Sequence, residues 1–173
     1  MGFGKKITID VTPDGLCEVR DFGRGIPLGK LLDCAAKINT GAKYDSDAFK
    51  KSVGLNGVGI KAVNALSDFF EIQAYRDGET RSYKFCRGKE LPKGRKDGAT
   101  EEPNGTRTAF HADPDIFPVT TQFRPEYIEK MCRYYSYLNK GLALHFNGRR
   151  YVSKNGLLDL LTEAMSKIGR AHV

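Results

Sequence analysis

Polar and apolar residues alternate along the first part of the chain. The alternation covers Lys5–Val11 and resumes over Leu16–Arg20, and the residues between these runs, Pro13-Asp14-Gly15, are typical of a tight turn. The pattern therefore predicts a β-hairpin. The second strand leads directly into Asp21-Phe22-Gly23-Arg24-Gly25-Ile26-Pro27, where two glycines and a proline predict an irregular loop.

The remaining apolar residues follow either helical or strand spacing. Helical spacing predicts helices over 28–38, 60–66, 125–139 and 157–166. Strand-like runs occupy 69–76, 80–87, 106–110 and 142–146. A long loop rich in Gly, Ser, Asp and Lys spans 41–59, and loops of this length are usually functional. This order of elements predicts an α+β fold in which one layer of helices covers one sheet.

Composition narrows the class of protein further. The 173 residues are 40% hydrophobic and 28% charged, which fits one globular domain, or one domain plus a fragment of a second, and excludes a disordered or low-complexity chain. No apolar run approaches the roughly 18 residues of a membrane helix, so we expect a cytoplasmic protein. The four cysteines form no C-x-x-C pair, which argues against a zinc site or a disulfide framework.

The net charge favours polyanionic partners. There are 28 Lys and Arg against 21 Asp and Glu, which gives +7 at pH 7. Nucleotides and nucleic acid would both be attracted by this excess, and charge alone does not choose between them.

The loop that begins at Asp21 combines a carboxylate with backbone that carries little side-chain bulk. Glycines at 23 and 25 would let a flat ligand approach closely, while the carboxylate accepts hydrogen bonds from an amino group such as that of adenine. The alternative is a surface turn closed by an Asx-type hydrogen bond.

A second glycine cluster, Gly54-Leu55-Asn56-Gly57-Val58-Gly59, leads into a predicted helix. Backbone N–H groups and a helix N-terminus could together hold phosphate oxygens there, and Lys43, Lys50 and Lys51 could neutralise phosphate charge. The order G-x-x-G-x-G matches neither the dinucleotide fingerprint nor the P-loop. A flexible lead-in to the helix with solvated lysines is the alternative.

Basic residues are concentrated between Lys84 and Lys96, where six Lys or Arg face one acid, Glu90. Pro92 and Gly94 predict an exposed loop, which could contact a nucleic-acid backbone. A solvated hairpin tip is the alternative, because the segment has no interleaved pattern of aromatic side chains for base stacking.

Several ordered motifs together resemble the ATPase domain of the B subunits of bacterial type IIA topoisomerases, the group within the GHKL ATPases that includes the B subunits of topoisomerase IV (ParE) and of DNA gyrase. The motifs are Asp21-x-Gly-Arg-Gly-Ile-Pro27, Asn39-Thr-Gly-Ala-Lys-Tyr-Asp45, Lys51-Ser-Val-Gly-Leu-Asn-Gly-Val-Gly59, Ala62-Val-Asn-Ala-Leu-Ser67, Asn104-Gly-Thr106 and Leu138-Asn139-Lys140-Gly141. The resemblance extends to about Ser166. It implies the GHKL (Bergerat) fold, a two-layer α/β sandwich whose mixed, mostly antiparallel sheet is covered by helices.

The resemblance also implies an ATP site. Asp21 would bind the adenine amino group directly and through a water, Gly25 and Thr106 would complete that pocket, and Arg24 and Pro27 would form its mouth. Backbone amides of the second glycine cluster would wrap the phosphates as the end of an ATP lid. The implied ATP-binding residues are Asp21, Gly23, Arg24, Gly25, Ile26, Pro27, Lys43, Lys50, Gly54, Leu55, Asn56, Gly57, Val58, Gly59 and Thr106.

The chain departs from the family pattern at three positions. Phe22 replaces the commoner Asn or Asp, Ala42 replaces the second glycine of Gly-Gly-Lys, and Asn56 replaces the His of Leu-His-Gly. Asn56 can still donate a hydrogen bond to phosphate but cannot become cationic, so we expect a modest effect.

Two functional residues of the family have no counterpart in these 173 residues. The Glu that activates the attacking water and the Asn that holds Mg²⁺ belong to a helix before the first strand, where this chain has only Met1–Gly4. We therefore assign no catalytic residue and no metal ligand, and expect the chain alone not to hydrolyse ATP. Residues 1–166 are expected to form the ATPase domain without that helix, and 167–173 to be a non-native tail.

By resemblance, the parent protein is the ATP-hydrolysing component of a type IIA topoisomerase, in which ATP closes a dimeric gate and drives DNA strand passage. The implied cofactors are ATP and Mg²⁺. The implied partners are DNA, the A subunit of the topoisomerase (ParC/GyrA-like) and a second copy of the ATPase region, with no membrane. Two alternatives stay open: a nucleotide- or DNA-binding module without catalysis, and another GHKL ATPase such as a MutL-type repair protein or a histidine kinase.

Overall fold

The alternating run at the start of the chain forms the predicted hairpin. In the computed structural model, which describes residues 4–37, 58–118 and 122–170, Val11 pairs with Cys17 and Ile7 with Asp21 in antiparallel register. The elements, in chain order, are β1 (Lys6–Val11), β2 (Cys17–Asp21), the 3₁₀ turn η1 (Leu28–Lys30), α1 (Leu31–Ala36), α2 (Gly59–Ala65), β3 (Ser67–Arg76), β4 (Glu79–Cys86), β5 (Lys89–Glu90), β6 (Lys96–Ala99), β7 (Gly105–Ala112), α3 (Pro125–Leu138), β8 (Ala143–Phe146), β9 (Arg149–Tyr151) and α4 (Leu157–Arg170).

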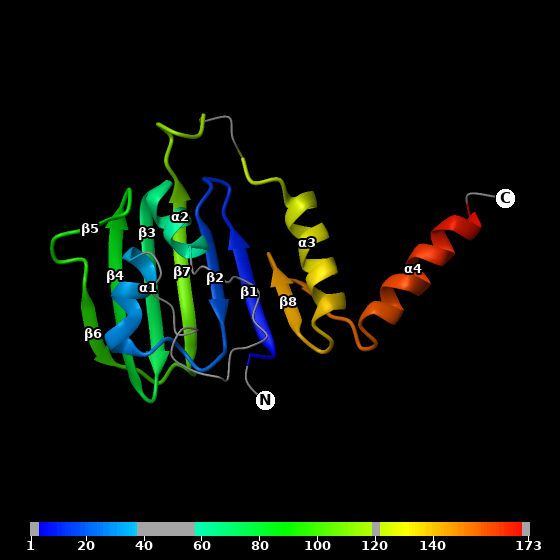
Figure 1. Ribbon diagram of the computed structural model, residues 1–173, viewed down its shortest axis with the longest axis horizontal. Coiled ribbons are helices and arrows are strands. Elements are labelled where there is room, and N and C mark those ends of the chain that lie inside the picture. Colours follow the sequence, from blue (N-terminus) through cyan, green and yellow to red (C-terminus); the bar gives the residue numbers. More distant parts are fainter. Residues whose placement is uncertain (1–3, 38–57, 119–121, 171–173) are drawn as a thin grey trace.

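Within the described residues, the strands join in one nine-stranded sheet, shown in Figure 1. The order is β5-β4-β3-β7-β2-β1-β8-β9, and β6 also pairs with β4. β1 and β8 run parallel, whereas the other strand pairs are antiparallel. The prediction of a mixed, mostly antiparallel sheet is confirmed.

One face of the sheet is apolar and is covered by helices. Phe70, Ile72 and Phe85 are fully buried beneath Leu31 and Ala35 of α1. Burying side chains of this size stabilises the fold by about 1.5–3 kcal/mol each. Figure 1 shows α1 and α2 lying over the β3 and β4 side of the sheet, which confirms the predicted single helical layer there.

A second core lies under α3, toward the edge of the sheet that β8 and β9 form. Cys132 of α3 packs with Leu144 and Phe146 of β8, and partly buried Ile7 and Ile9 of β1 complete the cluster. The side chains of α3 that meet the sheet recur at helical spacing, as expected for an amphipathic helix. In Figure 1, α4 extends away from the sheet beyond α3. No helix of the described residues is long and apolar enough to cross a membrane.

The opposite face of the sheet carries charged side chains. Arg107 of β7 bridges Glu18 of β2, at 2.6 Å, and Glu71 of β3, at 3.0 Å. The hydrogen bond to Glu18 is the main reason that the pKa of Arg107 is raised above its ordinary value. The sheet is therefore polar on one face and apolar on the other, which explains the alternation along its strands.

Two sequence predictions about local structure were wrong in detail. The segment between Lys84 and Lys96 is not one exposed loop, because β4 continues to Cys86 and two short strands, β5 and β6, pair with β4. The predicted helix over 28–38 begins as a 3₁₀ turn, and its α-helical part ends at Ala36. Lys37 is extended, so the helix cannot continue through it.

Candidate functional site

Asp21 is the last residue of β2, where the sheet ends and the glycine loop begins. Its Oδ1 accepts a hydrogen bond from the backbone N–H of Gly23 at 2.8 Å. This is the Asx-type contact that the sequence left open as an alternative. The other oxygen, Oδ2, has no hydrogen-bond partner among the residues that the structure describes. Within the described part of the chain, one acceptor of the carboxylate is therefore available at the end of the strand.

The strand register places Asp21 beside Thr106. Arg20 of β2 pairs with Arg107 of β7, so the next antiparallel positions are Asp21 and Thr106. On β3, Ala74 pairs with Thr106 and shares a face with buried Ile72. Because opposed residues of neighbouring strands point to the same face, the side chains of Asp21 and Thr106 lie on the helix-covered face of the sheet.

Two glycines bring backbone segments into close contact at this end of the sheet. Gly25 has φ +72°, and a Cβ there would lie 2.4 Å from the carbonyl oxygen of Tyr75 and 3.2 Å from that of Gly105. A Cβ on Gly105, where φ is +150°, would lie 2.1 Å from the carbonyl oxygen of Asp21. The structure thus brings together Asp21, Gly25 and Thr106, three of the predicted site residues, around a cradle that side chains would fill.

The rest of the first motif surrounds this cradle. Arg24 and Pro27 are exposed, as residues at the mouth of a site would be, whereas Ile26 packs against the core beneath α1. Arg76 donates from Nη1 to the carbonyl oxygen of Gly25 at 3.2 Å. Sequence reasoning missed Arg76, since its position at the end of a strand carries no distinctive signal. It also missed Gly105 as a site residue, although its place beside Thr106 in a Gly-Thr pair was a signal.

The predicted phosphate loop is mostly outside the described part of the chain. Lys43, Lys50, Gly54, Leu55, Asn56 and Gly57 all lie there. Val58 and Gly59 are described, and they are exposed where α2 begins. At the other end of α2, Asn64 is buried and donates to the carbonyl oxygen of Ala35 at 3.1 Å. This contact fixes α2 against α1.

Acidic partners neutralise several cations around the basic segment. Arg81 and Arg95 both bind Asp97, and Lys84 lies 3.8 Å from Glu71. The side-chain hydrogen bond from Arg81 is the main cause that lowers the pKa of Asp97. Since these cations are paired within the chain, the segment offers less free positive charge than its sequence indicated.

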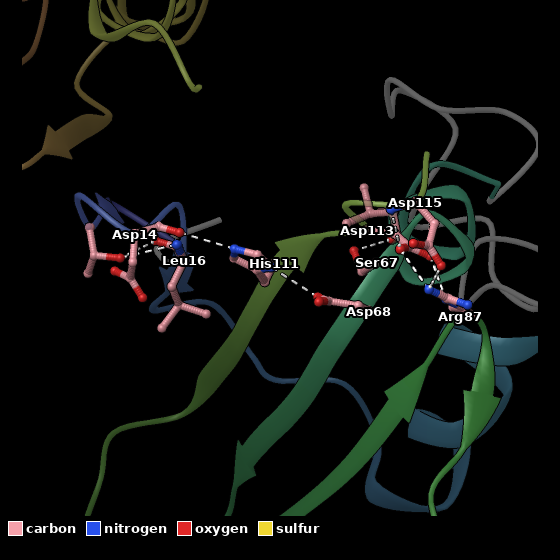
Figure 2. Close-up of polar contacts among 10 residues, drawn as sticks. Asp14, Leu16, Ser67, Asp68, Arg87, His111, Asp113 and Asp115 are labelled. Carbon is pink, nitrogen blue, oxygen red and sulfur yellow. Dashed lines mark hydrogen bonds and ion pairs between the residues drawn. The ribbon is translucent and has the colours of Figure 1, made fainter. Parts of the chain in front are cut away.

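Polar contacts at the opposite end of the sheet hold loops together (Figure 2). His111 bridges Asp68, 3.0 Å from its Nδ1, and the carbonyl oxygen of Asp14, 3.1 Å from its Nε2. Arg87 binds Asp115 and the buried carboxylate of Asp113, with 2.6 Å between Nε and Oδ2. A cavity of about 540 Å³ lies at this end, lined in part by Asp14 and His111. It is therefore separate from the Asp21 site.

Metal-ligating side chains are not clustered in the part of the chain that the structure describes. Among the described residues, no group of three or more His, Cys, Asp or Glu side chains is placed to hold a metal ion. Asp21 faces Thr106 and two glycines, a donor set that suits an organic amino group better than a divalent cation.

Comparison with known proteins identifies relatives of this sequence. The B subunit of DNA topoisomerase 4 from Borreliella burgdorferi is 43% identical over 161 residues, which cover 93% of this chain and 26% of the relative. The chain is homologous to part of the bacterial type II topoisomerase B subunits. The B subunit of DNA gyrase from Mycobacterium tuberculosis (strain H37Ra) is 35% identical over 156 residues, covering 86% of the chain and 23% of that protein. The chain thus spans about a quarter of the length of these relatives. No family model matches it.

A solved structure agrees with the fold. The 43K ATPase domain of Thermus thermophilus gyrase B, crystallised in complex with an aminocoumarin, superposes with a TM-score of 0.75 at 24% sequence identity. The match covers 94% of this chain and 44% of that one. The predicted GHKL fold, an α+β sheet with packing helices, is confirmed by this similarity.

Proposed function

We propose that this chain binds ATP in the cradle at the end of β2, as part of the B subunit of a type II DNA topoisomerase. The observation that carries the proposal is the placement of Asp21. Its Oδ2 has no hydrogen-bond partner among the described residues, and its side chain lies on the helix-covered face beside Thr106, next to the close approach of Gly25 and Gly105. A carboxylate oxygen accepts hydrogen bonds from the amino group of adenine, whereas the carbonyl oxygen that guanine carries at the same place would be repelled.

The lid residues complete the proposed site. Backbone amides from Gly54 to Gly59 would bind the phosphates, with Lys43 and Lys50 in reach, as the family resemblance implies. The positive net charge of the chain supports binding of a polyanionic nucleotide.

ATP binding and ATP hydrolysis are separate proposals for this chain. The 173 residues contain no counterpart of the family's general base or of its Mg²⁺-binding Asn before β1. We therefore propose that this chain alone binds ATP without turning it over. In the whole protein, ATP with Mg²⁺ would drive DNA strand passage in the cytoplasm, together with the A subunit of the topoisomerase and a second copy of the B subunit.

Base preference tests the proposed function. The purified chain is titrated by calorimetry with non-hydrolysable analogues of ATP and GTP. The proposal predicts saturable binding of the ATP analogue and an affinity for the GTP analogue at least about tenfold weaker, as expected when one hydrogen bond is replaced by a repulsive contact. A folded chain that binds neither analogue, or binds both equally, contradicts the proposal.

A further inference from the structure

Arg20 is a buried arginine directly before Asp21. It has 7% exposure, although it points to the polar face of the sheet, opposite the face that carries the Asp21 side chain. A buried guanidinium is costly unless its donors are satisfied. The contacts of the Arg20 guanidinium therefore show how its burial is compensated.

The guanidinium is held by carbonyl oxygens and aromatic rings. Nη1 donates to the carbonyl oxygen of Asp21, and Nη2 donates to that of Pro103 at 2.6 Å. The guanidinium carbon lies 4.7 Å from the ring centre of Phe22 and 4.2 Å from that of Tyr75. Arginine suits such a position because its planar group can stack while its fork of donors binds two acceptors.

These contacts join the segments that form the cradle. Asp21 is the last residue of β2 and Phe22 follows it, Pro103 precedes β7, and Tyr75 lies near the end of β3. The guanidinium also packs closely against Gly105, because a Cβ on that residue would lie 2.2 Å from Arg20 Nη1. Arg20 thus links three neighbouring strands at the point where the side chain of Asp21 leaves the sheet.

We propose that Arg20, clamped between Phe22 and Tyr75, is a positioning residue that orients Asp21 for recognition of adenine from the opposite face of the sheet. The inference rests on the proposed function. It gives Phe22, which departs from the commoner residues of the motif, a specific role as one wall of the clamp. Since Arg20 does not face the ligand, its loss should alter the discrimination between bases by displacing Asp21, rather than by removing a contact with the nucleotide.

The test is the ratio of affinities for non-hydrolysable ATP and GTP analogues, measured by calorimetry on the full chain. Arg20→Gln should lower the preference for ATP by about tenfold, the factor of one lost hydrogen bond. Arg20→Lys should recover only part of it, because an ammonium group cannot stack as a plane or bind both carbonyl oxygens in the same way. The matched control is Arg107→Gln, which removes the arginine opposite Arg20 on the same face and should leave the ratio unchanged.

The outcomes separate the inference from the proposed function. If the wild-type chain prefers ATP and folded Arg20→Gln keeps that preference, Arg20 has no positioning role. If Arg20→Gln does not fold, Phe22→Leu removes one ring of the clamp and should still reduce the ratio, and an unchanged ratio overturns the inference. A wild-type chain without any preference for ATP overturns the proposed function and the inference with it.

Discussion

Gly105 lies directly against the backbone of Asp21, because a Cβ atom on residue 105 would be 2.1 Å from the Asp21 carbonyl oxygen. The residue proposed to recognise adenine is thus packed against a neighbouring strand that tolerates no side chain at this point. This relationship makes the cradle sensitive to the smallest possible substitution.

Gly105→Ala should therefore destabilise the fold as well as the site. The φ of +150° alone disfavours an L-residue, and strain of this kind costs about 1–3 kcal/mol. The contact with backbone, which cannot move away as a flexible side chain would, should place the loss at or above the upper end of that range. Urea unfolding of both proteins measures the difference.

Gly78→Ala is the matched control for that measurement. Gly78 also has a positive φ, +83°, but apart from its chain neighbours no atom of the described residues lies within 4 Å of the position of its Cβ. Gly78→Ala should therefore lose only the free energy of unfolding that the strained positive φ costs, with no added cost from a steric clash. Equal losses in the two variants would show that residue 105 is not crowded by Asp21.

The Arg87–Asp113 pair should behave as a coupled unit. Burial opposes ionisation of Asp113, but hydrogen bonds from the Asp115 N–H and from Arg87 hold the pKa of Asp113 below its ordinary value. Arg87→Met leaves that buried carboxylate without its cation and should lower the melting temperature more than Arg87→Lys does.

A double-mutant cycle tests the coupling between these two side chains. Asp113→Asn should be less harmful in the Arg87→Met background than in the wild type, because the uncompensated charge is then removed. Additive changes in the free energy of unfolding would mean that the pair does not act together.

His111 should make stability depend on pH. The hydrogen bond to Asp68 is the main cause that raises the pKa of His111 above 6.5, and the contact with the Asp14 carbonyl acts in the same direction. A pKa raised on folding stabilises the fold fully below the unfolded value, and that contribution is lost as the pH rises through the folded value. His111→Gln should therefore destabilise the protein more at pH 5.5 than at pH 9.

Unfolding of His111→Gln and wild type by urea at both pH values measures this difference. His145→Gln, on β8, is the control that removes a histidine while leaving the pair of His111 and Asp68 intact. A loss for His111→Gln that is the same at both pH values would contradict the role assigned to the Asp68 contact.

The cysteines should react in an order set by burial. Burial is the main cause that raises the pKa of Cys17 to about 11, with Asp10 and Glu18 contributing. Its thiolate fraction at pH 8 is then about a hundredfold below that of a thiol with a pKa of 9.0. Cys132, also buried, has its pKa raised mainly by burial.

Alkylation of the native chain, followed by mass spectrometry of its peptides, gives the order directly. Half-buried Cys34 and Cys86 should be modified first, and Cys17 and Cys132 only when urea unfolds the chain. Rapid modification of Cys17 in the folded protein would mean that β2 is not packed as described.

Local patterns predicted most of the elements because their causes are local. The hairpin of β1 and β2 follows from alternation around Pro13-Asp14-Gly15, and α3 follows from helical spacing after Pro125. The parallel pairing of β1 with β8 joins segments far apart in the chain, and Asn147 accepts from the Val11 N–H across 136 positions. Such pairing depends on tertiary packing, which periodicity does not record. The short strands β5 and β6 were not predicted, because they are held in place by pairing with β4 and not by a pattern of their own.

The site shows the same division. The loop after Asp21 was predicted from its glycines and its place in a family motif, and the structure places Asp21, Gly25 and Thr106 together. The carbonyl contacts of Arg20 and Arg76 were not predictable, since they depend on strands that meet only in the folded sheet. A side chain that binds a distant backbone carbonyl produces no recognisable pattern in the sequence around it.

Asp21→Asn tests the central claim most directly. Because Gly23 N–H already binds Oδ1, the Asn amide oxygen would take that contact and turn its NH₂ group toward the adenine amino group, where two donors oppose each other. The measurement is the affinity for a non-hydrolysable ATP analogue, by calorimetry, with Asp10→Asn as the control for loss of one carboxylate. The account predicts a loss of at least about tenfold for Asp21→Asn and none for Asp10→Asn. Equal affinity of Asp21→Asn and the wild-type chain would contradict it.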